Sequence, residues 1–119
     1  HIMVGDLNIA PFENDVWSHK QLLEVVSHTP IEVEKMTALR DSKDWVDTAR
    51  EFVPLTEKLY SWWSYRNRDW LKSNRGRRLD HIWLTPNMRK QLLSCDIYIK
   101  ARSHANPSDH VPVVVELAL

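Results

Sequence analysis

Apolar and polar positions alternate along several short segments of the chain, and this period of two predicts strands. The cleanest case is the last segment, where every second residue from 111 to 119 is apolar and would share one face of a strand. Residues 78–85 alternate in the same way, and residues 59–65 and 96–102 also read as strands. Residues 2–4 read as the end of a further strand that runs into Gly5.

The segments between these predicted strands contain sequence patterns typical of helices. Residues 17–26 predict a short helix, and Pro86 opens another that runs to residue 93. Thr29, Pro30 and Glu32 form a strong helix start, with a capping residue, a proline in the first turn and a capping-box partner. This helix is expected to end near residue 41. The mixture predicts an α/β fold in which a sheet carries flanking helices.

Length and composition set the limits of this prediction. A chain of 119 residues, 43% of them hydrophobic, allows one small domain or part of a larger one, and it shows no internal repeat or linker. Residues 1–3 read in part like the remainder of a removed tag, so His1 is left out of the functional reasoning and the domain is taken as residues 4–119. The longest apolar run, at 113–115, is too short to cross a membrane. Cys95 is the only cysteine, which favours a reducing compartment, and the expected location is the cytoplasm.

Charge is balanced over the chain but not along it. Residues 66–78 hold six basic residues and one acid, whereas residues 13–57 hold most of the acids. A basic stripe on a neutral body can bind a phosphate backbone. A solvated loop with a cluster of like charges explains the same pattern equally well.

Candidate catalytic side chains stand at the ends of the predicted strands. Asp6 and Asn8 are two residues apart, so at a strand end both side chains point to one side, where they can hold a water and contact a phosphate. An Asx turn is the alternative reading of Asp6 and Asn8. Asp80 lies on an apolar strand face, where a carboxylate needs a partner. His110, beside Asp109 in a loop before the last strand, is the proposed partner, and Arg66, Arg77 or Arg78 is the alternative.

Two tryptophans lie side by side near the basic stripe. On a strand, Trp62 and Trp63 face opposite ways, so one can enter the core while the other faces a groove and stacks on a base or sugar. The alternative places both in the core. No pair of histidines or cysteines has the spacing of a structural zinc site.

Four segments, in this order, resemble the exonuclease III branch of the endonuclease/exonuclease/phosphatase superfamily, which includes the abasic-site endonucleases. They are Gly5-Asp6-Leu7-Asn8, the Ser-Trp-Trp-Ser-Tyr-Arg segment at 61–66, the Asn-Arg-Gly-Arg-Arg-Leu-Asp segment at 74–80, and Ser108-Asp109-His110. The first and last occur across the superfamily, and the middle two are narrower. The resemblance implies a magnesium-dependent hydrolysis of DNA phosphodiesters, with manganese as an alternative ion. The implied partner is double-stranded DNA with abasic sites or 3′ ends.

The resemblance also implies roles for individual residues. Asp6 would activate the attacking water or protonate the leaving group, Asn8 would contact the phosphate, and Asp80 would orient His110, which contacts the scissile phosphate. The metal site would draw on Asp6, Asn8, Asp109 and His110. DNA would be bound by Trp62, packed on the abasic sugar, and by Arg66, Arg75 and Arg77.

The resemblance covers only the second half of the family domain, from about Val4 to Leu117. The implied fold is therefore the C-terminal half of a four-layer α/β sandwich. A metal-binding Glu and a catalytic Tyr of the missing N-terminal half have no counterpart here. Metal binding is accordingly expected to be weak, the chain alone inactive, and its uncovered apolar surface prone to self-association. The alternatives are another phosphodiesterase or phosphatase of the superfamily, or a non-catalytic fragment that only folds, associates or binds DNA weakly.

Overall fold

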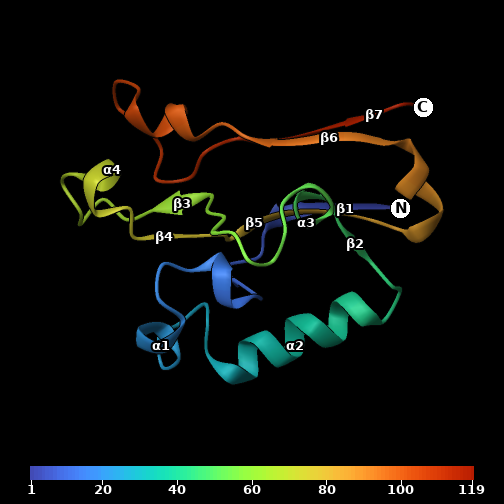
Figure 1. The fold of residues 1–119 in the computed structure, drawn as a ribbon, viewed down its shortest axis with the longest axis horizontal. Coiled ribbons are helices and arrows are strands. Elements are labelled where there is room, and N and C mark those ends of the chain that lie inside the picture. Colours follow the sequence, from blue (N-terminus) through green and yellow to red (C-terminus); the bar gives the residue numbers. More distant parts are fainter.

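The computed structural model describes all of residues 1–119 and places three small antiparallel sheets among short helices (Figure 1). The strands are β1 (Ile2–Asp6), β2 (Val46–Asp47), β3 (Trp62–Trp63), β4 (Gly76–Arg77), β5 (Asp80–Leu84), β6 (Leu92–Ile97) and β7 (Val113–Leu117). The α-helices are α1 (His19–Leu22), α2 (Pro30–Asp41), α3 (Thr48–Phe52) and α4 (Trp70–Ser73). Short 3₁₀ helices are η1 (Glu13–Asp15), η2 (Pro86–Gln91) and η3 (Ile99–Ser103).

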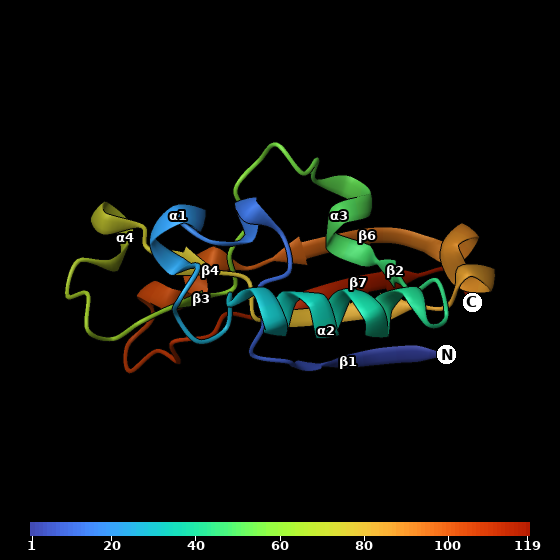
Figure 2. The same ribbon diagram turned by 90° about the horizontal axis from the view of Figure 1, so that it is seen from below.

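The sheets form layers. The three-stranded sheet has the order β1–β5–β2, with β5 in the centre. The β6–β7 hairpin lies on one side of this sheet and α2 on the other (Figure 1), and the turned view shows α2 running along the sheet (Figure 2). None of the helices is long and apolar enough to span a membrane.

The longest helix, α2, begins as the sequence predicts. Thr29 and Glu32 form the capping box, and Pro30 occupies the first turn. The side chain of Met36 is buried, whereas Leu39 is 45% exposed, so the helix covers its sheet through a narrow apolar stripe.

Several strand and helix predictions were too long or displaced. The helix expected over 17–26 is limited to α1, and the residues after it form short turns with local hydrogen bonds. The strand expected over 59–65 is limited to the two residues of β3, because hydrogen bonds to distant segments take up the neighbouring backbone. The strand expected over 96–102 was wrong. Strand β6 starts earlier, at Leu92, and η3 follows it. The last strand ends at Leu117 rather than Leu119.

A buried charge network holds the segment that leads into β5. Arg78 is 1% exposed and donates two hydrogen bonds to each of Asp15 and Asp47, at 2.7–2.9 Å. Arg50 adds a further bond to Asp15 at 2.7 Å. Both partners of Arg78 are themselves buried, so the arginine joins η1 and β2 to the start of β5.

Candidate catalytic and DNA-binding site

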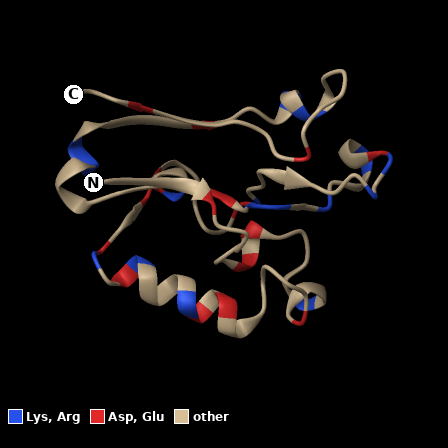
Figure 3. Cartoon of the chain, turned by 180° about the vertical axis from the view of Figure 1, so that it is seen from behind, with Lys and Arg blue, Asp and Glu red and all other residues tan.

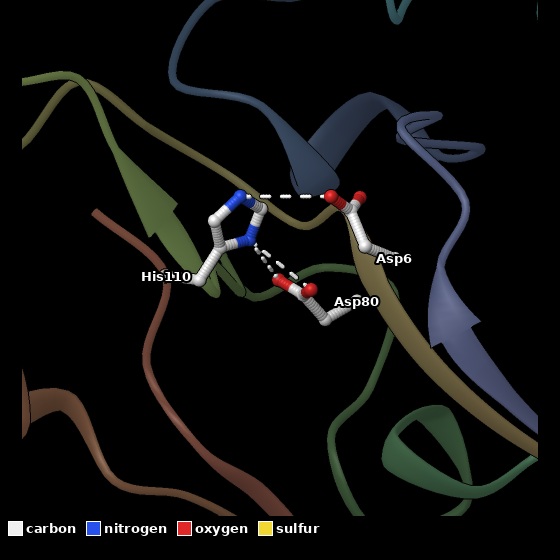
Figure 4. Close-up of side chains that lie close together, drawn as sticks. All are labelled: Asp6, Asp80 and His110. Carbon is white, nitrogen blue, oxygen red and sulfur yellow. Dashed lines mark hydrogen bonds and ion pairs between the residues drawn. The ribbon is translucent and has the colours of Figure 1, made fainter. Parts of the chain in front are cut away.

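The ends of β1 and β5 bring two carboxylates together. The two strands pair antiparallel, and their register sets Asp6 directly opposite Asp80. Opposed like charges on neighbouring strands repel each other, so this arrangement favours a cationic group beside them. His110 occupies that place (Figure 4).

The loop that carries His110 is fixed by backbone bonds to the β3 segment. Trp62 forms an isolated antiparallel bridge with His110, the N–H of Trp63 donates to the Asp109 carbonyl, and the N–H of Val111 donates to the Ser61 carbonyl. These bonds explain how a residue 30 positions from Asp80 along the chain reaches the same site.

His110 bridges the two carboxylates. Its Nδ1 lies 2.8 Å from Oδ2 of Asp80 and 3.1 Å from Oδ1, so Nδ1 carries a hydrogen and donates it to Asp80. Its Nε2 lies 3.6 Å from Oδ2 of Asp6. The predicted pairing of Asp80 with His110 is thus present, and Arg66, Arg77 and Arg78 do not take its place.

The surroundings of His110 favour its charged form. Partial burial alone would lower the pKa of His110. The hydrogen bond that His110 donates to Asp80 and the negative charge of Asp80 outweigh this effect, with help from the charges of Asp6 and Asp109, and they raise the pKa of His110 above its ordinary value. The ring therefore holds two N–H donors over a wider range of pH than a free histidine does.

Ser61 anchors the carboxylate that holds the histidine, and sequence reasoning gave it no role. Its buried hydroxyl donates to Oδ2 of Asp80 at 2.7 Å and accepts from the N–H groups of Leu79 and Asp80. A signal was available: Ser61 directly precedes the tryptophan pair. A serine, however, occurs in so many settings that nothing else in the sequence marks it.

Only some of the predicted metal ligands offer free ligand atoms that lie close together. Asp6, Asp80 and His110 offer ligand atoms that all lie within 4.8 Å of one another. Asp109 is adjacent, but its Oδ2 accepts the indole N–H of Trp62 at 3.0 Å. Asn8 adopts a left-handed conformation with φ 55°, and its backbone N–H donates to Oδ1 of Asp6 at 3.0 Å, as in an Asx turn.

The four residues expected to bind DNA line one open cavity beside this site. Trp62, Arg66, Arg75 and Arg77 share it with Trp17, Ser64 and Asn67. The guanidinium of Arg77 lies 5.2 Å from the ring centre of Trp62, and that of Arg75 lies 4.6 Å from the ring centre of Trp17. Trp63 is buried at 2% exposure while Trp62 is half-buried, which confirms that the pair faces opposite ways. Trp17 had no predicted role, because the sequence placed it at the start of a helix over 17–26, whereas in the structure it precedes α1 and lines this cavity.

The basic residues gather on this side of the molecule. Figure 3 shows Lys and Arg along β4 and the loop that contains α4, whereas the acidic residues gather on α2 and at the strand ends. The cavity therefore combines aromatic faces with positive charge at the edge of the Asp6–His110 site.

Known proteins resemble the chain over nearly its whole length. Exodeoxyribonuclease III of Haemophilus influenzae is 26% identical, in a match that covers 97% of this chain and 45% of that protein. An AP endonuclease structure from Archaeoglobus fulgidus superposes with a TM-score of 0.93 at 29% identity, over 99% of this chain and 45% of that one. The 3′ phosphatase NExo from Neisseria, bound to a product DNA hairpin, superposes with a TM-score of 0.90 at 28% identity and with the same coverage.

The chain thus spans less than half the length of these relatives. The α/β fold and the likeness to exodeoxyribonuclease III are confirmed at that partial length. The sequence profile described as "Endonuclease/Exonuclease/phosphatase family" matches residues 1–110. The chain belongs to the endonuclease/exonuclease/phosphatase family.

Proposed function

We propose that the whole protein is a magnesium-dependent DNA-repair phosphodiesterase that removes nucleotides from 3′ ends and incises 5′ to abasic sites. One observation carries the proposal: the Asp6–His110–Asp80 cluster opens beside a cavity lined by Trp62 and arginines. The cluster suits phosphodiester hydrolysis, and the cavity suits a nucleic-acid backbone with an exposed sugar or base. The similarity to an exodeoxyribonuclease III and to an AP endonuclease supports DNA as the substrate.

His110 is suited to binding the scissile phosphate. Its Nδ1–H is held by Asp80, so the ring is oriented and Nε2 faces outward toward Asp6. In the imidazolium form, which the raised pKa favours, Nε2–H donates a charge-assisted hydrogen bond to a non-bridging phosphate oxygen. This bond strengthens as negative charge builds up on that oxygen in the transition state.

Asp6 is placed to handle the proton of the attacking water. Its carboxylate is 38% exposed and close to Nε2 of His110, so a phosphate bound by the histidine lies within its reach. The water oxygen forms a bond to phosphorus, the bond from phosphorus to the 3′ oxygen breaks, and Asp6 accepts the water proton. The departing oxygen takes a proton from solvent. The reverse assignment, in which Asp6 protonates the leaving oxygen, uses the same geometry.

The residues present fit a magnesium or manganese ion. The Asp80 carboxylate already accepts bonds from Ser61 and His110, which leaves Asp6 as the available carboxylate of the cluster. Magnesium is commonly held by one or two carboxylates together with substrate phosphates and waters. Asp6 would hold the ion, with Asn8 and Asp109 as nearby oxygen donors, and the ion would neutralise phosphate charge and acidify bound water.

Trp62 and the arginines would hold the DNA. The Trp62 indole is fixed by its bond to Asp109, so its face is held in position beside His110. A sugar without a base exposes an apolar face that packs on such a ring, while Arg66, Arg75 and Arg77 contact phosphates. The same features count against a superfamily phosphatase that acts on small soluble substrates, because a small substrate needs no extended basic wall.

The 119-residue chain alone is not expected to cleave DNA. The cluster offers one free carboxylate to a cation, and the site is open to solvent on this side. We therefore expect DNA binding without measurable cleavage. The expected cytoplasmic location stays a prediction.

The test uses a fluorescent duplex with one abasic site, with and without Mg²⁺. Binding is expected to weaken as salt rises, and Trp62→Ala is expected to reduce the preference for the abasic duplex over an intact one. Lys100→Ala, at an exposed position outside the cavity, serves as the matched control. Equal binding of both duplexes by the wild-type chain would contradict the assignment of the cavity, and cleavage lost in Asp6→Asn would contradict the expected inactivity.

A further inference from the structure

A buried arginine, Arg102 in η3, lies at the end of the molecule that carries α4 (Figures 1 and 2). Arg102 is 5% exposed, and an arginine is rarely buried without a charged partner. The other buried arginine, Arg78, has such partners in Asp15 and Asp47, whereas Arg102 forms no ion pair. The proposed reaction gives this buried charge no role.

Aromatic rings and a carbonyl group surround Arg102 instead. Its Nε–H donates to the carbonyl oxygen of Trp63 at 3.2 Å. Its guanidinium carbon lies 5.0 Å from the ring centre of Tyr65 and 5.7 Å from that of Trp70. A guanidinium over an aromatic ring is attracted by the negative face of the ring, and the attraction is stronger away from water. These contacts take the place of a carboxylate.

The same contacts join both ends of one loop, residues 64–73, to η3. The carbonyl of Trp63 and the ring of Tyr65 lie where the chain leaves β3, and Trp70 begins α4, from which the chain continues to β4. The rings of Trp63 and Trp70 also meet edge to face, with their centres 5.2 Å apart. Arg102 thus packs against both the outgoing and the returning part of the loop.

This loop carries basic side chains of the candidate DNA-binding surface. Arg66 lines the cavity beside Trp62, and it also lines a second cavity together with Arg68 and Lys72. Positive charge therefore continues from Trp62 along the loop. The three basic side chains are exposed and form no ion pair, so their positions depend on the backbone that presents them.

Arg66 is the basic residue whose position depends most directly on Arg102. It follows Tyr65 in the chain, and the ring of Tyr65 lies against the Arg102 guanidinium. The hydroxyl of Tyr65 also donates to the carbonyl oxygen of Pro107 at 2.7 Å, which restricts the ring further. A backbone fixed at Tyr65 sets the direction in which the Arg66 side chain leaves the loop.

We propose that Arg102 is a positioning residue, which holds the loop 64–73 so that Arg66 meets a DNA phosphate beside Trp62. The inference rests on the proposed function, because Arg66 needs a fixed position only if the cavity binds DNA. Arg102 is itself buried and lines neither of the two cavities, so its removal acts on DNA through the loop.

The test measures how salt weakens the binding of a fluorescent abasic duplex. Each phosphate contact contributes about 0.9 to the slope of log affinity against log salt concentration. Arg66→Ala and Arg102→Met are each expected to reduce this slope by about 1, and the double variant is expected to reduce it no further. Lys100→Met removes one charge from an exposed position of η3 and is the matched control, expected to leave the slope unchanged. An unchanged slope in Arg102→Met, or a fall in the double variant equal to the sum of the two single falls, would overturn the proposal.

Hydrogen exchange tests the hold on the loop in the absence of DNA. The amides of Lys72, Ser73 and Asn74 are hydrogen-bonded at α4. Arg102→Met is expected to speed their exchange and to leave the exchange of β5 unchanged, whereas a general loss of stability would speed both. Unchanged exchange at α4, or an equal acceleration in β5, would count against Arg102 as a positioning residue.

Tyr65 offers a second variant that leaves the buried charge in place. Tyr65→Leu removes one of the two rings from a side chain that is 59% exposed, so it is expected to fold and to reproduce both effects even if Arg102→Met does not fold. Neither effect in Tyr65→Leu would contradict the proposal. If the wild-type chain does not bind the duplex, the proposed function fails, and the exchange at α4 still decides whether Arg102 holds the loop.

Discussion

Replacing Arg78 by methionine tests whether the buried charge network holds the start of β5. The substitution keeps much of the volume of the side chain and removes four hydrogen bonds of 2.7–2.9 Å to Asp15 and Asp47. All three side chains are at least nine-tenths buried, so two carboxylates lose their main partner in a site with little water. Breaking one side of a buried ion pair costs about 3–5 kcal/mol. The total stability of a domain is typically only about 5–15 kcal/mol.

The assay is urea unfolding followed by tryptophan fluorescence. Arg89→Met is the matched control, because Arg89 pairs with Glu51 at the surface, where such pairs contribute about 0–1 kcal/mol. We expect Arg78→Met to lower the free energy of unfolding by several kcal/mol and Arg89→Met to lower it by less than about 1 kcal/mol.

The pH dependence gives an independent check on the same variant. Burial alone would raise the pKa of Asp47, but the charge and hydrogen bonds of Arg78 outweigh it and hold the pKa below 3.8. A lowered native pKa adds stability that is complete above the unfolded pKa and is lost as pH falls through the native one. The difference between wild type and Arg78→Met should therefore shrink as pH falls below 3.8. A loss under about 1 kcal/mol at neutral pH, or a difference that does not change with pH, would refute this reasoning.

Three further predictions concern the site and the surface. Asp80→Asn should lower the pKa of His110, measured by NMR titration of the histidine, toward 6.5. The substitution should also remove a contribution to the free energy of unfolding that is present below pH 6.5 and is lost as pH rises through the raised native pKa. An unchanged pKa of His110 would contradict the pairing with Asp80. Gly76→Ala should cost about 1–3 kcal/mol in urea unfolding because its Cβ would overlap the Tyr60 ring, whereas Gly5→Ala meets only an ordinary contact at 3.8 Å and should be mild; equal effects would contradict this. The exposed apolar side chains of β1 and β7 should drive self-association, which sedimentation across a dilution series would detect and a monomer at all concentrations would disprove.

Local sequence signals predicted the parts of the fold that depend on near neighbours. The capping box at Thr29 and Glu32 fixed the start of α2, and alternation located β5 and β7. The failure at residues 59–65 has a clear cause. In residues 59–65 an aromatic-rich run looks like a strand, but its backbone bonds go to Asn14, Arg77 and Asp109 from distant parts of the chain. Such pairing is invisible to any local pattern.

The part of the candidate site that the sequence predicted is the pairing of a charged side chain with the partner it needs. A carboxylate on an apolar strand face needs compensation, and this reasoning led from Asp80 to His110. The partners of Arg78 were not predictable, because Asp15 and Asp47 lie in a three-residue 3₁₀ helix and a two-residue strand, both too short to carry a periodic signal. Ser61 was missed for a similar reason, since its role depends on a hydroxyl position that only the folded backbone defines.

We propose that His110, held by Asp80, acts in the active site of a DNA phosphodiesterase. The most direct measurement is incision of an abasic duplex by a single-chain protein in which residues 1–119 replace the matching part of Haemophilus influenzae exodeoxyribonuclease III, with and without His110→Asn. Circular dichroism and duplex binding confirm that both proteins fold alike. We expect magnesium-dependent incision by the parent chimera and a fall in the incision rate of about 100-fold or more in the variant, with duplex binding little changed. Incision by His110→Asn at the parent rate would contradict it.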